Sequence, residues 1–344
     1  MKSEMALCAV VMLLLAACGP KNTSSSAFER LDPAFDALVP ADAEIELLAT
    51  GFQFTEGPVY SPDGTLYFSD IPANAIYKWT PQLGVSVFRR PSGYDGADAP
   101  DGAFIGSNGL TLDKEGRLIV CQHGNGQVVR LEKDGSVAVL AGRYQGKRLN
   151  SPNDVVVKSD GAIYFTDPPY GFPKQDEDPR KELKFNGVYR LNPDGSLMLL
   201  TTELSRPNGL VFSPDEKYLY VANSDPARKI CMRYEVKPDG ALGPGQVFFD
   251  VTSRPEEGSP DGVKVDTNGN VYSTGPGGIW VFSPDGKHLG VIRPPQPPAN
   301  LAWGKYAKTH DEAAIGKGDR ADTLYITART GIYRVRLSAA GVRP

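Results

Sequence analysis

The stretch NGLVFSPDE at residues 208–216, followed by KYLYVAN at 217–223, contains the unit from which the whole chain is built. A polar residue, Asn208, precedes a short run of β-formers, a turn and a second β-rich run. Five other stretches share this layout: EGPVYSPDG at 56–64, NGLTLDKEG at 108–116, NDVVVKSDG at 153–161, DGVKVDTNG at 261–269 and the more divergent NLAWGKYAK at 300–308. A unit of roughly 40–55 residues made only of short strands and turns predicts a propeller or a similar array.

The fold class that we predict is all-β, a single six-bladed β-propeller of four-stranded blades over residues 41–340. The sixth unit supplies only three strands, near 299–303, 323–327 and 331–337, whereas EIELLA at 44–49 stands alone before the first unit. We therefore expect this N-terminal strand to close the ring as the outer strand of blade six. Residues 28–40 would form an ordered arm or a short helix on the outside.

Composition narrows the classes of partner. The 344 residues include 37 Gly and 29 Pro, clustered as turns between apolar runs, and the formal net charge is −4. A nucleic-acid surface needs clustered Lys and Arg, so the charge argues against one. Small molecules and metal cations are the expected partners, and no sequence feature indicates an oligomeric state.

The N-terminus has the features of a targeting segment. Lys2 precedes an apolar run at 6–17 that is too short to span a bilayer but is typical of a signal peptide. The run ends in LAACG, which resembles a bacterial lipobox and implies cleavage after residue 17 and lipidation of Cys18. Residues 18–40 would then be a flexible tether and arm. The protein would be lipid-anchored in the periplasm or at the cell surface. Gly19, rather than Asp, after the cysteine indicates the outer membrane by analogy with other lipoproteins. The alternative is an ordinary secretory signal with an incidental cysteine.

Two further cysteines, Cys121 and Cys231, fall in different predicted blades without a CxxC spacing. A zinc knuckle or redox pair is therefore not indicated. A long-range disulfide and two buried free thiols both remain compatible with the sequence.

Equivalent positions of successive blades lie on a ring around one axis, so the polar residues that open the six units should converge. These residues are Glu56, Asn108, Asn153, Asn208, Asp261 and Asn300. A single Asn-Gly or Asp-Gly more often marks a hairpin turn, but these dipeptides share a common phase and precede strands. All six side chains offer oxygen, which suits Ca²⁺ rather than metals that prefer nitrogen or sulfur. The ring therefore predicts one Ca²⁺ in the channel, with Mg²⁺, Mn²⁺ or Zn²⁺ as substitutes.

The same residues carry a resemblance to a known family. TEGPVY around Glu56, SPNDVVV around Asn153, RPNGLVFSPD around Asn208 and SPDGVKVD around Asp261 resemble the motifs of the gluconolactonase and regucalcin family, which are calcium-dependent six-bladed propeller hydrolases. FTDPPYG and CQHGNGQV are similar to the bacterial gluconolactonase branch, and the resemblance covers residues 44–337.

By this resemblance, Glu56, Asn153, Asn208 and Asp261 bind the metal, and the reaction is hydrolysis of a sugar lactone to the hydroxy acid. The ion would polarise the carbonyl while water attacks, and Asp261 is the expected catalytic acid–base group. No GxSxG motif supports a serine hydrolase.

Five other residues are expected to contact the substrate, namely Asn108, His123, Asp167, Tyr170 and Asn300. Alternatives are open for three of them: His123 as a hydrogen-bonded structural residue, Asp167 as a turn cap, and Tyr170 as packing beneath its loop. Strand direction places the long loops on the face that carries the ring. One of them, 168–186, would be either a lid over the pocket or a solvated loop.

One departure from the family concerns the substrate. Ser151 stands where regucalcin-type members carry an Arg that helps to hold a sugar lactone. Two other functions therefore remain alternatives: a calcium-dependent phosphotriesterase or other esterase on this scaffold, and a non-catalytic binding propeller with a structural ion.

Overall fold

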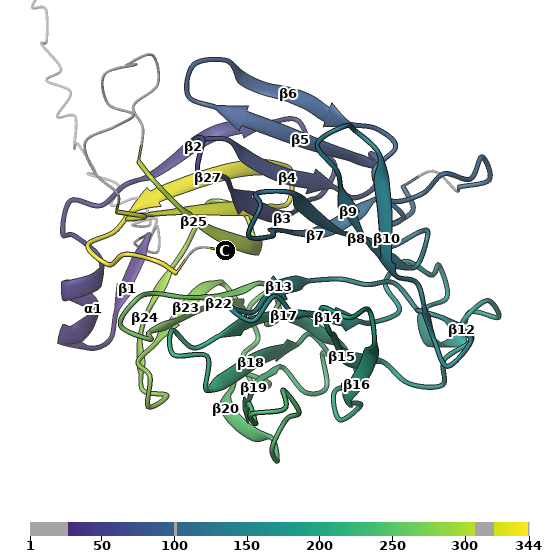
Figure 1. Ribbon diagram of the computed structural model, residues 1–344. Helices are drawn as coiled ribbons and strands as arrows, with labels where there is room; N and C mark the ends of the chain where they lie inside the picture. The colour runs from purple at the N-terminus through teal and green to yellow at the C-terminus, as the bar shows by residue number, and fades with distance from the viewer. Residues whose placement is uncertain (1–26, 100–101, 307–319, 343) are drawn as a thin grey trace, which may run out of the picture.

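The computed structural model describes residues 27–99, 102–306, 320–342 and 344. Within them, the chain forms six antiparallel sheets of four or five strands arranged around a central axis, as Figure 1 shows, and one further two-stranded sheet. The predictions of a signal peptide at 1–17 and of lipidation at Cys18 lie outside these residues and stay predictions. No helix of the described chain is long and apolar enough to cross a membrane.

The first three blades follow the chain in order. Blade one contains β3 (Thr55–Tyr60), β4 (Leu66–Asp70), β5 (Ala75–Thr80) and β6 (Gly84–Arg89). Blade two contains β7 (Ser107–Leu112), β8 (Leu118–Gln122), β9 (Gln127–Leu131) and β10 (Val137–Ala141). A ribbon of β11 (Arg143–Tyr144) and β12 (Lys147–Arg148) leads to blade three, which contains β13 (Val155–Val157), β14 (Ile163–Asp167), β15 (Gly187–Leu191) and β16 (Leu197–Thr201).

The remaining blades complete the circle. Blade four contains β17 (Pro207–Phe212), β18 (Tyr218–Asn223), β19 (Ile230–Glu235) and β20 (Gln246–Asp250). Blade five contains β21 (Val263–Val265), β22 (Val271–Gly275), β23 (Gly278–Phe282) and β24 (His288–Ile292). Blade six contains β25 (Pro298–Gly304), β26 (Thr323–Ala328), β27 (Gly331–Arg336) and β2 (Ile45–Thr50). The first strands β3, β7, β13, β17, β21 and β25 contact one another in that cyclic order and line the axis.

The ring closes as the sequence predicts. Strand β2 pairs antiparallel with β27, with Ile45 opposite Val335 and Thr50 opposite Gly331. The N-terminal strand thus supplies the outer strand of blade six and joins the two ends of the propeller. Closure removes the open seam that an unpaired blade edge would leave.

The arm before β2 is more structured than the sequence suggested. Strand β1 (Phe28–Arg30) pairs with β24 and adds a fifth strand to blade five, which was not expected. Helix α1 (Pro33–Leu38) follows, with the Asp32 carboxylate accepting the Ala34 N–H at 2.9 Å as an N-cap. Phe35 and Leu38 of the helix are buried between blades five and six.

Apolar side chains fill the space between neighbouring blades. Most of the buried hydrophobic residues of the described chain fall into six clusters, one at each blade interface. Cys121 lies at the interface of blades two and three and Cys231 at that of blades four and five. Both are buried free thiols. Of the two alternatives that the sequence left open, a long-range disulfide and two free thiols, the structure contains the free thiols.

Candidate metal and substrate site

A cavity of about 290 Å³ lies at the end of the channel where the first strands begin. Five of the six ring residues line it: Glu56, Asn108, Asn153, Asn208 and Asp261. The remaining lining comes from loops of the same face and consists of Phe54, Ile71, Phe104, His123, Tyr170, Gln175 and Ser224. The common phase of the repeats therefore brings these side chains to one place, together with an apolar wall that the sequence did not reveal.

Close packing between blades explains the glycines that follow the ring residues. A Cβ on Gly57 would lie 2.0 Å from the Asn108 carbonyl oxygen, and one on Gly209 would lie 2.1 Å from the Asp261 carbonyl oxygen. The Gly209 N–H also donates to that Asp261 oxygen at 3.0 Å. The glycines belong to blade-to-blade contacts and not to hairpin turns, and they fix the spacing of the ring residues.

Three buried oxygens of the cavity have no hydrogen-bond partner. They are Asn108 Oδ1, Asn208 Oδ1 and Asp261 Oδ1. An unsatisfied buried acceptor costs roughly 1–3 kcal/mol. A cation would satisfy the oxygens of Asn208 and Asp261 together, and a substrate bound beside it would satisfy that of Asn108. Among the described residues, no three His, Cys, Asp or Glu side chains are grouped so that they alone could hold a metal ion. The donor set of the cavity is one of amide and carboxylate oxygens, which fits a hard cation.

The electrostatics of the side chains in this cavity point the same way. Burial and the neighbouring Asp154 raise the pKa of Glu56 to about 7. Burial, then Glu56, then Asp154 raise the pKa of Asp261 well above its usual range. The carboxylates repel one another in a poorly solvated site, and a divalent cation would relieve that repulsion.

Asn300 lies behind the cavity and not in its lining. Its Nδ2 donates to Glu56 Oε2 at 3.0 Å, and its Oδ1 accepts the Leu301 N–H at 2.8 Å. Asn300 therefore holds the Glu56 carboxylate, and the expected substrate contact stays a prediction. Beside it lies Asp154, which is 3% exposed and which the sequence argument overlooked. The available signal was that Asp154 stands where four of the six units have glycine.

His123 is locked in one tautomer. Its Nδ1 lies 3.2 Å from the Phe104 carbonyl oxygen, which can only accept, so Nδ1 carries the proton. Its Nε2 then accepts from Asn108 Nδ2 at 3.1 Å. Burial lowers the pKa of His123 to about 4, which keeps the ring neutral. His123 orients the Asn108 amide. Its two hydrogen bonds are those of a structural residue, which was the alternative to a substrate contact.

Ser224 joins two parts of the site. Its Oγ accepts from Asn208 Nδ2 at 2.7 Å and donates to the carbonyl oxygen of Pro260, the residue before Asp261, at 2.8 Å. Tyr170 lines the same cavity as Ser224. Ser224 therefore turns the Asn208 oxygen away from itself and links the Asn208 amide to the segment before Asp261, a role that no sequence motif signalled.

Asp167 does not line the cavity. It is fully buried at the end of β14, and its Oδ2 accepts the Asn150 N–H at 2.8 Å. Asp70 at the equivalent place in blade one accepts the Gln53 and Phe54 N–H groups at 3.0 Å. Both carboxylates hold the segment that leads into the ring residue of their own blade, so the contacts of Asp167 support the backbone before Asn153.

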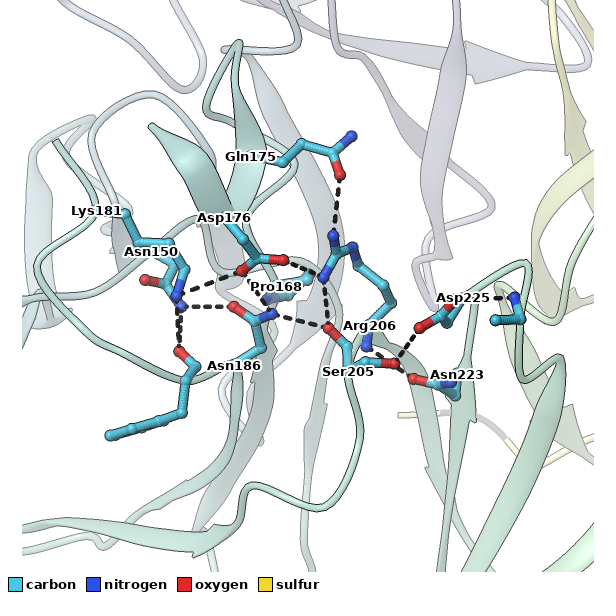
Figure 2. Close-up of polar contacts among 12 residues, drawn as sticks. Asn150, Pro168, Gln175, Asp176, Lys181, Asn186, Ser205, Arg206, Asn223 and Asp225 are labelled. Carbon is cyan, nitrogen blue, oxygen red and sulfur yellow. Dashed lines mark hydrogen bonds and ion pairs between the residues drawn. The ribbon is translucent and has the colours of Figure 1, made fainter. Parts of the chain in front are cut away.

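Loop 168–186 reaches the cavity through Tyr170 and Gln175 and is anchored at Asp176 (Figure 2). Asp176 accepts from Asn186 Nδ2 at 3.1 Å, lies 3.5 Å from the Lys181 ammonium and is paired with Arg206. The short 3₁₀ turn η1 (Gln175–Glu177) carries this carboxylate. The loop covers part of the cavity and is tied to blade four, beside Asn208.

Ser151 serves the same loop. Its Oγ donates to the Pro168 carbonyl oxygen at 2.6 Å and accepts the Gly171 N–H at 2.9 Å. These two bonds bracket Tyr170. The residue that departs from the regucalcin pattern therefore holds the turn that presents Tyr170 to the cavity.

A second, larger cavity of about 660 Å³ lies at the opposite mouth of the channel. It is lined by the distal ends of the first strands, including Leu112, Val157 and Phe212, and by Val342 near the chain end that Figure 1 marks at the hub. None of the six ring residues lines it. Its walls are mainly apolar, so the chemistry belongs to the smaller cavity.

Comparison with known proteins agrees with this geometry. The family model described as the SMP-30/Gluconolactonase/LRE-like region matches residues 54–330. The chain belongs to this family. The match runs from the start of β3 to the turn before β27 and includes the six ring residues.

Individual relatives place the chain within the family. A gluconolactonase of Zymomonas mobilis is 39% identical over 325 residues, which are 91% of this chain and 86% of that protein. The structure of a gluconolactonase from Xanthomonas campestris superposes with a TM-score of 0.75 at 34% identity, covering 90% of this chain and 94% of the other. The calcium-binding protein regucalcin of Agrobacterium tumefaciens, at 18% identity and a TM-score of 0.66 over 88% and 96% of the two chains, shares the fold.

Proposed function

We propose that the protein is a calcium-dependent lactonase that hydrolyses a sugar lactone of the gluconolactone type to its hydroxy acid. The observation that carries the proposal is the group of three buried oxygens without partners, on Asn108, Asn208 and Asp261, in one cavity with Glu56 and Asn153. The similarity to gluconolactonases over nine tenths of the chain supports the reaction class.

The ligands that we assign to the ion are Glu56, Asn153, Asn208 and Asp261. Two carboxylates and two amide oxygens match the preference of Ca²⁺ for oxygen and balance its charge. Mg²⁺, Mn²⁺ or Zn²⁺ could substitute with a poorer match of ligand number or type. Such an ion, when bound, supplies a Lewis acid for the carbonyl oxygen of the lactone.

The side chains of this protein supply the remaining chemistry. Asp261 accepts a proton from the attacking water and returns it to the ring oxygen as the acyl C–O bond breaks. His123 is neutral and already bonded through both nitrogens, so it positions Asn108 and moves no proton. Phe54, Ile71 and Phe104 form an apolar wall that limits the water around the reacting carbonyl.

The size of the site suits a small substrate. A volume of about 290 Å³ is at the lower end for small-molecule sites, and the polar ring on one side with apolar groups on the other fits a single polar ring compound. Tyr170 and Asn108 are the proposed substrate contacts. Ser151 holds Tyr170 in place, which gives this chain a way to bind a lactone without the Arg of regucalcin-type members.

The test uses purified protein stripped with a chelator and assayed on D-glucono-δ-lactone, a panel of other lactones and an organophosphate ester. We expect lactone turnover to be lost on stripping and regained with Ca²⁺. Asn208→Ala should weaken calcium binding, measured by calorimetry, whereas Asn192→Ala in the β15–β16 hairpin of blade three should not.

Two results would contradict the proposal. Turnover confined to the organophosphate would favour the phosphotriesterase alternative. Calcium binding without turnover of any ester would favour a binding propeller with a structural ion. A shift in melting temperature alone does not discriminate, because any ligand of the native state stabilises it.

A further inference from the structure

A layer of buried carboxylates contains two of the proposed metal ligands, Glu56 and Asp261, together with their neighbour Asp154. Glu56 and Asp154 are 2% and 3% exposed, and Asp261 shares the same group of interacting carboxyl groups. Among the described residues, Lys264 is the one cation within ion-pair distance of any of these three carboxylates. The hub thus combines three acidic groups with a single ammonium.

Lys264 reaches this layer from the opposite mouth of the channel. Its Nζ donates to the Val263 carbonyl oxygen at 3.1 Å, lies 3.4 Å from Asn300 Oδ1 and 3.9 Å from Asp154 Oδ2. The Lys264 side chain is 22% exposed and lines the larger cavity. Its contacts are all with oxygen atoms, which is the environment that a bound cation would have.

Asn300 connects the ammonium to the metal site. Its Oδ1 faces Lys264, and its Nδ2 donates to Glu56 Oε2 at 3.0 Å and lies 3.4 Å from Asp154 Oδ2. One amide therefore separates the ammonium from a proposed calcium ligand. At this distance, in a poorly solvated interior, charges interact strongly.

A count of formal charges shows what the ammonium does. Three carboxylates exceed one divalent ion by one negative charge, and an isolated buried charge is costly unless it is paired. Lys264 supplies the missing positive charge next to Asp154. With one divalent ion bound, the hub is neutral.

We propose that the Lys264 ammonium is a fixed counter-charge for Asp154 and thereby sets the affinity of the site for a single divalent cation. Lys264 touches neither substrate nor metal, so it acts through Asp154 and Asn300 as a positioning residue. The inference rests on the proposed calcium site. This role accounts for the presence of a lysine in a channel whose other charged groups near the metal site are carboxylates.

The experiment measures calcium affinity and stoichiometry by calorimetry on chelator-stripped protein for the native chain, Lys264→Met, Asp154→Asn and the double variant. We expect Lys264→Met to bind calcium at least tenfold more tightly, or to take up a second ion, because a repelling charge is gone. Asp154→Asn should bind at least tenfold more weakly. The double variant should return to within about threefold of the native chain, because both charges are absent.

A second measurement, denaturant unfolding without calcium, does not depend on the ion. Lys264→Met should unfold at a lower denaturant concentration than the native chain, because Asp154 is then buried without a partner. Lys264→Arg keeps the positive charge, so it should have the calcium affinity and the unfolding midpoint of the native chain. Lys158→Met is the matched control, since Lys158 lines the same cavity but pairs with Glu216 at 2.9 Å, and it should leave calcium affinity unchanged.

The outcomes separate the two proposals. If the native chain binds no calcium, the proposed function fails and this inference fails with it. If the native chain binds calcium but Lys264→Met binds with unchanged or lower affinity, the role of Lys264 is wrong while the calcium site stands. Loss of binding in Lys264→Met that Asp154→Asn does not reverse would indicate a purely structural role.

Discussion

Asp261 is assigned two roles with opposite demands on its carboxyl group. As a metal ligand it must be ionised, and a cation lowers its pKa, whereas a proton acceptor works best with a pKa near neutrality. Burial, Glu56 and Asp154 raise the pKa of Asp261. The neighbouring carboxylates therefore act on this pKa in the direction opposite to that of a bound ion.

This argument gives a prediction for Asp261→Asn. The amide keeps an oxygen for the metal but cannot accept a proton, so we expect calcium binding weakened by roughly tenfold and kcat lowered by about 10²–10⁴-fold at saturating calcium. Steady-state kinetics with added calcium measures the loss. A variant that binds calcium and keeps full turnover would remove Asp261 from the acid–base role.

At the residue scale, the sequence predicted the six ring residues but not the residues that hold them in place. Glu56, Asn153, Asn208 and Asp261 were found because the repeat and the family motifs mark them. Ser224 and Lys264 were missed because their contacts depend on side chains from different blades, which no local pattern records. Asn300 was placed in phase correctly, but phase alone could not show that its amide turns toward Glu56.

At the scale of elements, the first strands act as a set because their glycines allow close approach. Removing that freedom should disturb two blades at once. In Gly209→Ala the new Cβ would meet the Asp261 carbonyl oxygen at 2.1 Å, so β17 and the segment before β21 must move apart. We expect a loss of roughly 1–3 kcal/mol in the free energy of unfolding, together with weaker calcium binding.

Urea unfolding and calorimetry measure the two effects. Gly142→Ala is the control, because the nearest atom to its new Cβ is 3.5 Å away. Equal stability and calcium affinity in the two variants would contradict the close-packing explanation.

The strands themselves were predictable because each unit places short runs of β-forming residues between turn signals. Strand β1 was not, since three residues are too few for a recognisable β-rich run and its pairing depends on the free edge of β24. The anchoring of loop 168–186 by Asp176 likewise follows from tertiary contacts with Asn186 and Arg206. Loops of this length carry no periodic signal.

At the scale of the whole molecule, the arm and β2 hold the two ends of the ring together. Phe35 is fully buried against blades five and six. We expect Phe35→Ala to cost roughly 3–5 kcal/mol of unfolding free energy, with kcat for the lactone nearly unchanged, because the helix lies outside the propeller and away from the cavity.

Denaturant unfolding and lactone kinetics on the same preparation provide the test. Leu31→Ala nearby is the control, since Leu31 is 52% exposed. Comparable stability of the two variants would show that the arm does not support the ring.

Ring closure also determines when, during synthesis, the propeller can complete its fold. Pairing of Ile45 with Val335 joins residues that leave the ribosome at opposite ends of translation, and domains generally fold from the N-terminus onward as they emerge. Glu56 is made early, but its Asn300 partner and the strand that seals blade six arrive last. Strand β2 therefore lacks its native partner through nearly the whole of elongation, and the proposed calcium site is completed only at its end.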